Sequence, residues 1–331
     1  RSSRCRCLII KTCAQLRARS SASPNLTVTI ILGMCSGKSK SRLEIDGKQK
    51  KLPPTIKTSI CRAILMQLTN AEKSTHTLST TTLNTAIETL QRDGFVIFND
   101  VMQHSWVTST RNVFASELQS SNRDHSPIKH TRKGHGGFQP PLTMPFLDPL
   151  IIENSIVFQT LERLFGEHFF GCLPYGCNAS FPGSEQQNVH RDCGHIFPEE
   201  DVARPPMLVV ANIFLDDFTI ENGATEIWPG SHCKVDADKE ESSTLKISPS
   251  RWSKHTSTQT IAPSGSIVLR DMRTWHRGTA NTTTKIRTML SLVYYRPYFM
   301  PDNLTTAHGQ INEEDWQHIS LRARRTYRLH R

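Results

Sequence analysis

Residues 266–295, SIVLRDMRTWHRGTANTTTKIRTMLSLVYY, decide the fold class of this 331-residue chain. The β-branched and apolar residues of Ser266 to Arg270 predict one strand, and those of Ile286 to Tyr295 predict a second. The polar run Asn281 to Thr284 lies between them and predicts a turn. The two strands are therefore expected to be antiparallel, as in a β-sandwich or barrel.

The same segment brings a histidine and an arginine together. A turn centred midway through the polar run places His276 opposite Met289 on the return strand. Arg287 is then the diagonal neighbour of His276 on the same face, roughly 7–8 Å away between backbones. A dicarboxylate could bind a metal beside the histidine and pair its far end with the guanidinium. A core or turn histidine and a solvated strand arginine are the alternatives.

A second candidate lies upstream in Val189-His190-Arg191-Asp192. On a strand, His190 and Asp192 would point to the same face and could both reach one ion. Together with a distant histidine they form the two-histidine, one-carboxylate set that suits Fe(II) and leaves coordination positions open. The spacing alone is weak evidence, because 14 His and 30 acidic residues in this chain give roughly 1.3 chance occurrences. A surface ion pair is the alternative.

Helices precede strands along the chain. Apolar residues at helical spacing predict helices over about residues 80–93, from about Trp106 to Ser120, and from Ile152 to Phe165. Further strands are predicted at Phe95–Phe98, Phe169–Ala179, Met207–Leu215 and Met289–Tyr295. Residues 121–149 are expected to form a long loop. This order predicts an α+β domain in which helices buttress a β-sandwich or barrel.

The net charge of +10 belongs to one end of the chain. Residues 1–79 hold 15 Lys and Arg against three acids, a net of +12; the remaining 25 basic and 27 acidic residues give −2. We expect a basic leader over residues 1–78, disordered or targeting, and a folded domain over residues 79–331. The near-neutral domain argues against a nucleic-acid partner, and no apolar run is long enough for a membrane span.

Nine cysteines, with no C-x-x-C pair among them, favour reduced thiols. We therefore expect an intracellular and cytoplasmic protein. Organelle targeting by the basic leader is the alternative.

Five short motifs occur in a characteristic order. They are Asp93-Gly-Phe-Val-Ile97, His190-Arg-Asp192, Glu221-Asn-Gly-Ala-Thr225, Pro229-Gly-Ser-His232, and Trp275-His276 followed by Arg287. In this order they resemble the phytanoyl-CoA dioxygenase-like (PhyH) family of Fe(II)/2-oxoglutarate-dependent oxygenases, especially its fungal members. The likeness spans about residues 80–300. It implies a double-stranded β-helix (jelly-roll, cupin-like) core with flanking N-terminal helices, and a dioxygenase domain over residues 79–331.

The resemblance also implies roles for individual residues. His190, Asp192 and His276 would be the catalytic iron ligands, with Fe(II) as the metal and O₂ and 2-oxoglutarate as co-substrates. Arg287 would pair with the distal carboxylate of 2-oxoglutarate.

Three further residues are co-substrate candidates by the same resemblance. Gln187 and Thr225 match positions that often contact 2-oxoglutarate in similar proteins, with a sheet amide and a turn hydroxyl as the alternatives. Gln139 is a further candidate, from the loop before the third predicted helix.

The expected reaction is oxidation of a small organic molecule, such as a secondary metabolite, with release of succinate and CO₂. Halogenating family members lack the carboxylate ligand, so Asp192 favours hydroxylation or a related oxidation. The tail Arg328-Leu-His-Arg331 is not a peroxisomal signal, so a phytanoyl-CoA substrate is not expected. The rival interpretations are a zinc-dependent hydrolase with the same ligands, a non-catalytic jelly-roll binding protein, and a nucleic-acid-modifying oxygenase. A homodimer is plausible for the family.

Overall fold

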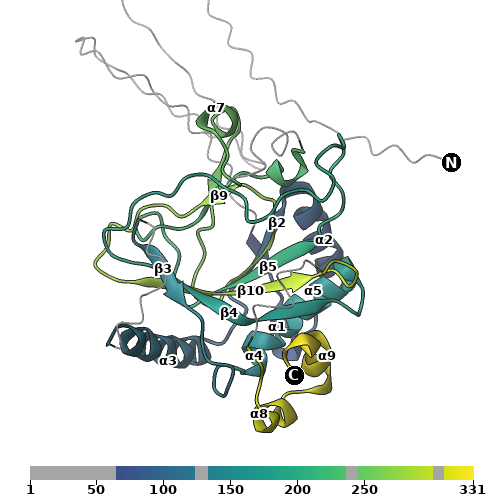
Figure 1. Ribbon diagram of the computed structural model, residues 1–331, viewed down its shortest axis with the longest axis vertical. Coiled ribbons are helices and arrows are strands. Elements are labelled where there is room, and N and C mark those ends of the chain that lie inside the picture. The colour runs from purple at the N-terminus through teal and green to yellow at the C-terminus, as the bar shows by residue number, and fades with distance from the viewer. Residues whose placement is uncertain (1–64, 124–132, 236–244, 301–308) are drawn as a thin grey trace, which may run out of the picture. The chain divides into compact units, whose positions relative to one another are not determined.

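The computed structural model describes residues 65–123, 133–235, 245–300 and 309–331 (Figure 1). Residues 1–64 of the predicted basic leader lie outside these ranges. Among the described helices, none has the length and the hydropathy that a bilayer crossing needs.

A seven-stranded sheet forms the larger of two sheets, with strand order β1-β2-β8-β5-β10-β4-β3. Its strands are β1 (Leu65–Gln67), β2 (Phe95–Asn99), β3 (His135–Phe138), β4 (Phe170–Ser180), β5 (Leu208–Phe214), β8 (Ile267–Asp271) and β10 (Arg287–Tyr295). Neighbouring strands are antiparallel, except that β1 runs parallel to β2. The strands predicted at residues 95–98, 169–179, 207–215, 266–270 and 286–295 all form, with bounds within two residues of those expected.

Two edge strands lie where the sequence pattern predicted none. β3 lies within residues 121–149, where a loop was predicted, and that prediction was wrong at this point. β1 and helix α1 (Asn70–Thr75) precede residue 79, so the sheet includes residues that were assigned to the leader. Strands of three and four residues are too short to show a periodicity.

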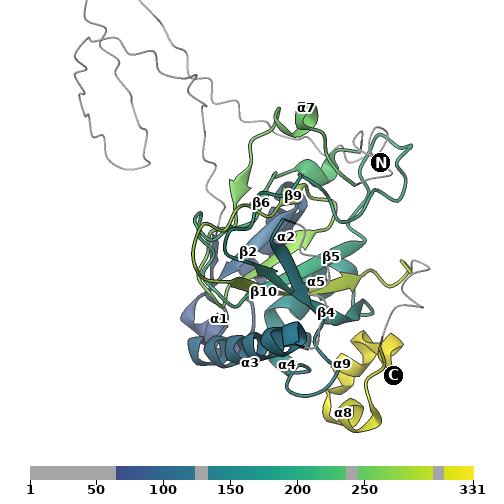
Figure 2. The ribbon, with the colours of Figure 1, turned by 60° about the vertical axis from the view of Figure 1, so that its left-hand side comes forward.

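A second sheet of three short strands faces the first across the domain (Figures 1 and 2). Its order is β7-β6-β9, with β6 at Glu226–Ile227, β7 at Thr258–Gln259 and β9 at His276–Arg277. An isolated antiparallel bridge between His190 and His276 continues it beyond β9. Two facing antiparallel sheets form the predicted jelly-roll core, and with the helices they make an α+β fold.

The predicted hairpin between His276 and Arg287 does not form. β9 pairs with β6, where His276 lies opposite Ile227, whereas Met289 of β10 pairs with Phe214 and Asn178. The prediction that His276 lies opposite Met289 was therefore wrong. In a jelly roll the chain crosses from one sheet to the other between successive strands, so that the two segments face each other.

Side chains on the central strands alternate between two environments, as the two-residue period of a strand requires. One set is buried in the main hydrophobic core toward the helices: Val209, Ala211, Ile213, Ile267, Leu269, Leu290 and Leu292. The alternate set lines a cavity between the two sheets: Val210, Asn212, Phe214, Val268, Arg270, Arg287, Met289, Ser291 and Val293. The large sheet therefore separates the core from the candidate site.

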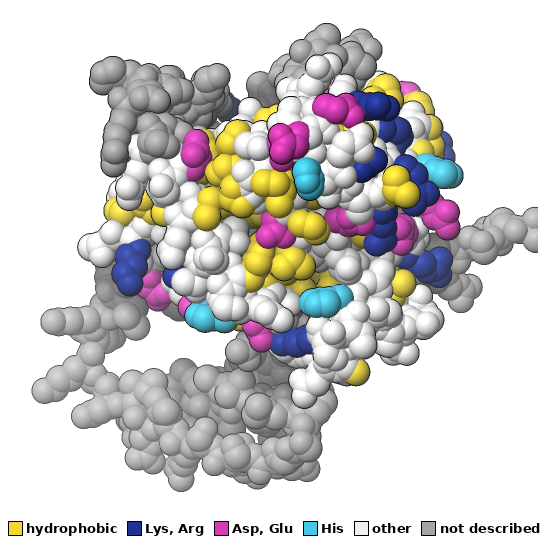
Figure 3. Space-filling model, turned by 90° about the horizontal axis from the view of Figure 1, so that it is seen from below, with side chains coloured by type: hydrophobic (Ala, Val, Ile, Leu, Met, Phe, Trp, Pro, Cys, Tyr) yellow, Lys and Arg dark blue, Asp and Glu magenta, His cyan; other side chains and the backbone are white. Residues whose placement is uncertain are grey.

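Helices cover the core face of the large sheet. The longer ones are α2 (Thr80–Asp93), α3 (His104–Arg123) and α5 (Ser155–Phe165); the shorter ones are α4 (Pro149–Ile152), α8 (Glu313–His318) and α9 (Leu321–Thr326). Helix α7 (Pro249–Trp252) lies instead beside β9 of the small sheet (Figure 1). Figures 1 and 2 both show α3, α4, α8 and α9 below β4. The surface seen from that side carries basic side chains gathered over one part of it (Figure 3).

Helix α2 and strand β2 meet at Gly94, which we call the Gly94 junction. The backbone there has φ +83°, and a Cβ atom would lie 2.4 Å from Thr274 Oγ1 and 2.6 Å from His232 Nδ1. The Gly94 carbonyl accepts hydrogen bonds from the Asp271 amide (2.8 Å) and the Thr274 hydroxyl (3.1 Å). Only glycine fits this left-handed, crowded position, and it anchors the loop that leads to His276.

Candidate metal centre and co-substrate pocket

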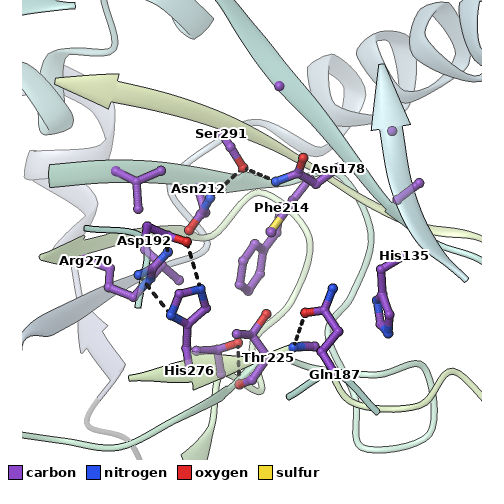
Figure 4. Close-up of a pocket in the computed structure, with 18 of the residues that line it drawn as sticks. His135, Asn178, Gln187, Asp192, Asn212, Phe214, Thr225, Arg270, His276 and Ser291 are labelled. Carbon is purple, nitrogen blue, oxygen red and sulfur yellow. Dashed lines mark hydrogen bonds and ion pairs between the residues drawn. The ribbon is translucent and has the colours of Figure 1, made fainter. Parts of the chain in front are cut away.

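A cavity of about 820 Å³ lies between the two sheets, and every residue predicted for the site lines it. These residues are His190, Asp192, His276, Arg287, Gln187, Thr225 and Gln139. Figure 4 shows Asp192 and His276 on one side of this space and Gln187 and His135 on the other. The volume lies within the range of roughly 300–1,000 Å³ typical of small-molecule sites.

His190, Asp192 and His276 form a cluster in which potential ligand atoms all lie within 4.8 Å of one another. Asp192 Oδ1 is 3.5 Å from His276 Nε2 and 3.9 Å from His190 Nε2. The two imidazole ring centroids are 4.3 Å apart. One carboxylate oxygen and two ring nitrogens thus converge on a common point.

Backbone carbonyls orient both rings. His190 Nδ1 lies 2.9 Å from the Asn188 carbonyl, and His276 Nδ1 lies 2.9 Å from the Thr274 carbonyl. A protonated Nδ1 that donates to a carbonyl leaves the Nε2 lone pair free for a metal. Both histidines therefore present the nitrogen that faces Asp192.

The backbone around His190 brings the ligands together in a way that differs from the expected strand. His190 pairs with His276 through two hydrogen bonds, from His190 N to His276 O (3.0 Å) and back (2.8 Å). Asp192 follows in a bend, where its amide donates to the Met272 carbonyl at 2.8 Å. The i and i+2 spacing predicted a shared face, and the shared face is present although the regular strand is not.

Asp192 is the electrostatic centre of the cluster. Its Oδ2 atom accepts a 2.6 Å hydrogen bond from Arg270 Nη2. Burial alone would raise the pKa of Asp192, but the surrounding histidine and arginine charges outweigh it and hold that pKa well below its usual range. Burial, followed by the Arg270 charge, lowers the pKa of His276 to about 3. At neutral pH the cluster is thus a carboxylate with a neutral His276, which suits a cation.

Arg287 is the cation expected to meet an anionic co-substrate. It is 4% exposed; Nη2 donates to the Gly223 carbonyl at 2.9 Å, and the guanidinium carbon lies 4.2 Å from the Phe218 ring centroid. Its Nε atom is buried without a hydrogen-bond partner among the described residues. Burial lowers the pKa of Arg287 to about 10. An unsatisfied buried donor on a cation fits an incoming carboxylate.

Strand register places Arg287 near His135, because Ser180 of β4 pairs with Arg287 on one side and with His135 on the other. Figure 4 shows His135 across the space from Asp192. A molecule that spans the cavity would therefore meet the cluster at one end and a cation at the other.

The three remaining candidates also face the cavity. Gln187 Oε1 accepts a 2.8 Å hydrogen bond from the Gly278 amide, which fixes the orientation of its side-chain amide. The Thr225 carbonyl accepts from the Thr260 amide at 2.9 Å. Gln139 is exposed and lines the same cavity.

Sequence reasoning missed a polar group on the sheet side of the cavity. Ser291 Oγ accepts hydrogen bonds from Asn212 Nδ2 (2.7 Å) and Asn178 Nδ2 (2.8 Å), and Figure 4 shows the serine between the two amides. Arg270 was missed as well. The available signal was the two-residue period: once Arg287 faces inward, so must Ser291 on the same strand.

The donor set fits a divalent metal ion. Two imidazoles and one carboxylate, open to a cavity, form the facial set of non-haem Fe(II) oxygenases, although zinc accepts the same donors. Arg287, with its unsatisfied buried Nε, fits the distal carboxylate of 2-oxoglutarate.

The profile of the phytanoyl-CoA dioxygenase (PhyH) family matches residues 90–289. Dioxygenase aneA of Aspergillus aculeatus is 33% identical over 102 residues, which are 28% of this chain and only 33% of the relative's length. Among solved structures, the non-heme alpha-ketoglutarate-dependent carbocyclase SnoK from nogalamycin biosynthesis shares 19% identity with a TM-score of 0.50, covering 70% of this chain and 91% of SnoK. The corresponding epimerase SnoN shares 16% identity with a TM-score of 0.49, covering 71% and 94%. The likeness to SnoK supports the fold.

Proposed function

The chain belongs to the phytanoyl-CoA dioxygenase family. From this premise we propose that it is an Fe(II)- and 2-oxoglutarate-dependent dioxygenase that hydroxylates or otherwise oxidises a neutral small molecule. The observation that supports this most strongly is the convergence of His190, Asp192 and His276 in a cavity that Arg287 also lines. A zinc hydrolase has no use for a buried arginine at that position.

The candidate site residues would have two roles, metal binding and co-substrate binding. The His190, Asp192 and His276 side chains would hold the metal, and Arg287 would hold the distal carboxylate of 2-oxoglutarate. When bound, iron with 2-oxoglutarate and O₂ supplies the oxidising power, with succinate and CO₂ as co-products. The protein contributes ligand geometry, a fixed orientation for the co-substrate and an enclosed space.

The cavity lining favours an uncharged substrate. Its charged side chains already have partners or proposed roles: Asp192 pairs with Arg270, and Arg287 is assigned to 2-oxoglutarate. The rest of the lining is apolar or neutral, including Val210, Phe214 and the amide–hydroxyl–amide group around Ser291. A substrate with an apolar skeleton and a carbonyl or hydroxyl group matches this surface, and a secondary metabolite is the class we favour.

The test is spectroscopic and enzymatic. Anaerobic addition of Fe(II) and 2-oxoglutarate should give a metal-to-ligand charge-transfer band, and O₂ should then produce succinate. His190→Ala and Asp192→Ala should lose both signals, whereas His318→Ala, at an exposed histidine outside the cavity, should keep both. Succinate formation that persists in His190→Ala would contradict the proposal, as would oxygen-independent turnover restored by Zn²⁺.

A further inference from the structure

Arg270 is a second buried arginine of the cavity, located at the metal end. It is 6% exposed, and Figure 4 shows it grouped with Asp192 and His276. It follows Val268 by two residues on β8, so the period of the strand turns both side chains toward the cavity. Neither of the two roles assigned to the site, metal ligand or carboxylate partner of 2-oxoglutarate, requires it.

The two carboxylate oxygens of Asp192 have different neighbours: Oδ2 accepts from Arg270, and Oδ1 lies near His276. Nη2 lies 2.6 Å from Oδ2, while Oδ1 remains 3.5 Å from His276 Nε2. Among the described residues, Arg270 is the side chain that donates to Oδ2. Its other terminal nitrogen, Nη1, lies 3.2 Å from His276 Nδ1, which carries the proton that is donated to the Thr274 carbonyl, so the hydrogen bond from Arg270 to a candidate ligand is the one to Asp192.

A carboxylate can bind a metal through one oxygen or through both. With one donor atom from each of three ligands, an octahedral ion keeps three positions, which a chelating 2-oxoglutarate and O₂ would together fill. A second oxygen from Asp192 would occupy one of those positions. A charge-assisted bond to Oδ2 is a direct way to prevent that.

We propose that Arg270 is a positioning residue that turns Oδ1 of Asp192 toward the metal and holds Oδ2 away from it. This inference rests on the metal site of the proposed function. A cation this close to a metal ion repels it, so an arginine here weakens binding unless its positioning of Asp192 outweighs the repulsion. The two effects have opposite signs, which makes them separable by experiment.

The experiment is a double-mutant cycle read by metal affinity in the absence of 2-oxoglutarate and O₂. Co(II) is titrated into wild type, Arg270→Met, Asp192→Ala and the double variant, and its visible absorption reports binding. We expect Arg270→Met to weaken Co(II) binding about 10–100-fold, as is typical when a partner of a metal ligand is removed. In the Asp192→Ala background the same change should leave Co(II) affinity unchanged or raise it, because only repulsion remains.

Two further variants keep the cycle interpretable. Arg322→Met removes another arginine–carboxylate pair, that with Glu162 on α5, and should leave Co(II) affinity at the wild-type value. Arg270→Lys keeps the charge but offers no planar fork, and should weaken binding to an intermediate degree. Thermal melts of each metal-free variant identify any loss of folding.

Three results would overturn the proposal: unchanged or tighter Co(II) binding by Arg270→Met, an equal loss in both Asp192 backgrounds, or a matching loss in Arg322→Met. Wild-type protein that binds no Co(II) would instead remove the proposed metal site. The failure of the proposed function is thereby distinguished from the failure of the role given to Arg270.

Discussion

Replacing Arg287 by Met should remove most of the affinity for 2-oxoglutarate without destabilising the metal-free fold. Burial lowers the pKa of Arg287 from its usual 12.5 to about 10, which corresponds to about 3 kcal/mol lost by the charged form on burial. The sign follows from the depressed pKa: at neutral pH the charged arginine opposes folding. The hydrogen bond to the Gly223 carbonyl and the contact with the Phe218 ring offset part of that cost.

The loss of co-substrate binding follows from the bond that the arginine would make. A hydrogen bond to a charged group contributes about 1.5–3 kcal/mol, so Arg287→Met should weaken 2-oxoglutarate binding about 10–100-fold. The assay combines titration of the anaerobic Fe(II) charge-transfer band with the melting temperature of the metal-free protein. Wild type should gain thermal stability from 2-oxoglutarate in the presence of metal, and the variant should gain little.

Arg296 provides the matched control. It also donates to two backbone carbonyls, those of Pro206 (2.9 Å) and Leu164 (3.1 Å), and lies 5.0 Å from the Phe165 ring, but it does not line the cavity. Arg296→Met should keep the wild-type affinity for 2-oxoglutarate. An unchanged affinity in Arg287→Met would refute the assigned role. A collapse of its metal-free melting temperature would show that the arginine holds the fold instead.

The pKa of metal-free His276 is about 3, below the value of 6.5 in the unfolded chain, so the unfolded chain binds the proton first as the pH falls. The free energy of unfolding should therefore keep its full value above pH 6.5 and decrease as the pH drops toward 3. In denaturant titrations, wild type should lose about 2 kcal/mol more than His276→Gln between pH 7.5 and pH 5. Gly94→Ala should cost more than about 2 kcal/mol, because a Cβ there meets Thr274 and His232 at 2.4–2.6 Å, whereas Gly183→Ala, at a similar positive φ with nothing within 4 Å, should cost less. Asn212→Leu should lower substrate-stimulated succinate formation about tenfold, with 2-oxoglutarate affinity within about twofold of wild type.

Each of these has an outcome that contradicts it. Equal pH dependence in wild type and His276→Gln would remove the buried neutral histidine as the cause. Equal costs at Gly94 and Gly183 would mean that the junction relaxes around a methyl group. A weaker 2-oxoglutarate affinity in Asn212→Leu would move this amide from the substrate to the co-substrate.

Much of the scaffold could be predicted because its elements are locally determined. Helix α2 has one apolar face and ends at a glycine, and it forms over the predicted residues 80–93. The long strands β4 and β5 are bounded by turn residues and form within two residues of the predicted limits. Short edge strands such as β1 lack such signals, since their position depends on a neighbour far along the chain.

The contacts within the candidate site could not be predicted from local sequence patterns. His276 and Arg287 were paired across a hairpin, yet they belong to different sheets that face each other. Both residues still reach the cavity, because facing sheets bring inward side chains together much as adjacent strands do. The contact between Arg270 and Asp192 joins residues 78 apart in sequence, and no spacing rule connects them.

The Gly94 junction also bears on how this family is recognised. The motif around Gly94, the Pro229-Gly-Ser-His232 motif and the segment before His276 meet there: the Gly230 amide donates to the Asp93 carbonyl (2.8 Å), and the Trp275 amide donates to the Ser231 hydroxyl (2.8 Å). These contacts brace the scaffold and do not touch a metal. A descendant that lost the histidine ligands would keep these contacts and would still be assigned to the family, although it could no longer hold the metal. Membership therefore reports ancestry, and catalytic competence has to be judged separately at the ligand positions.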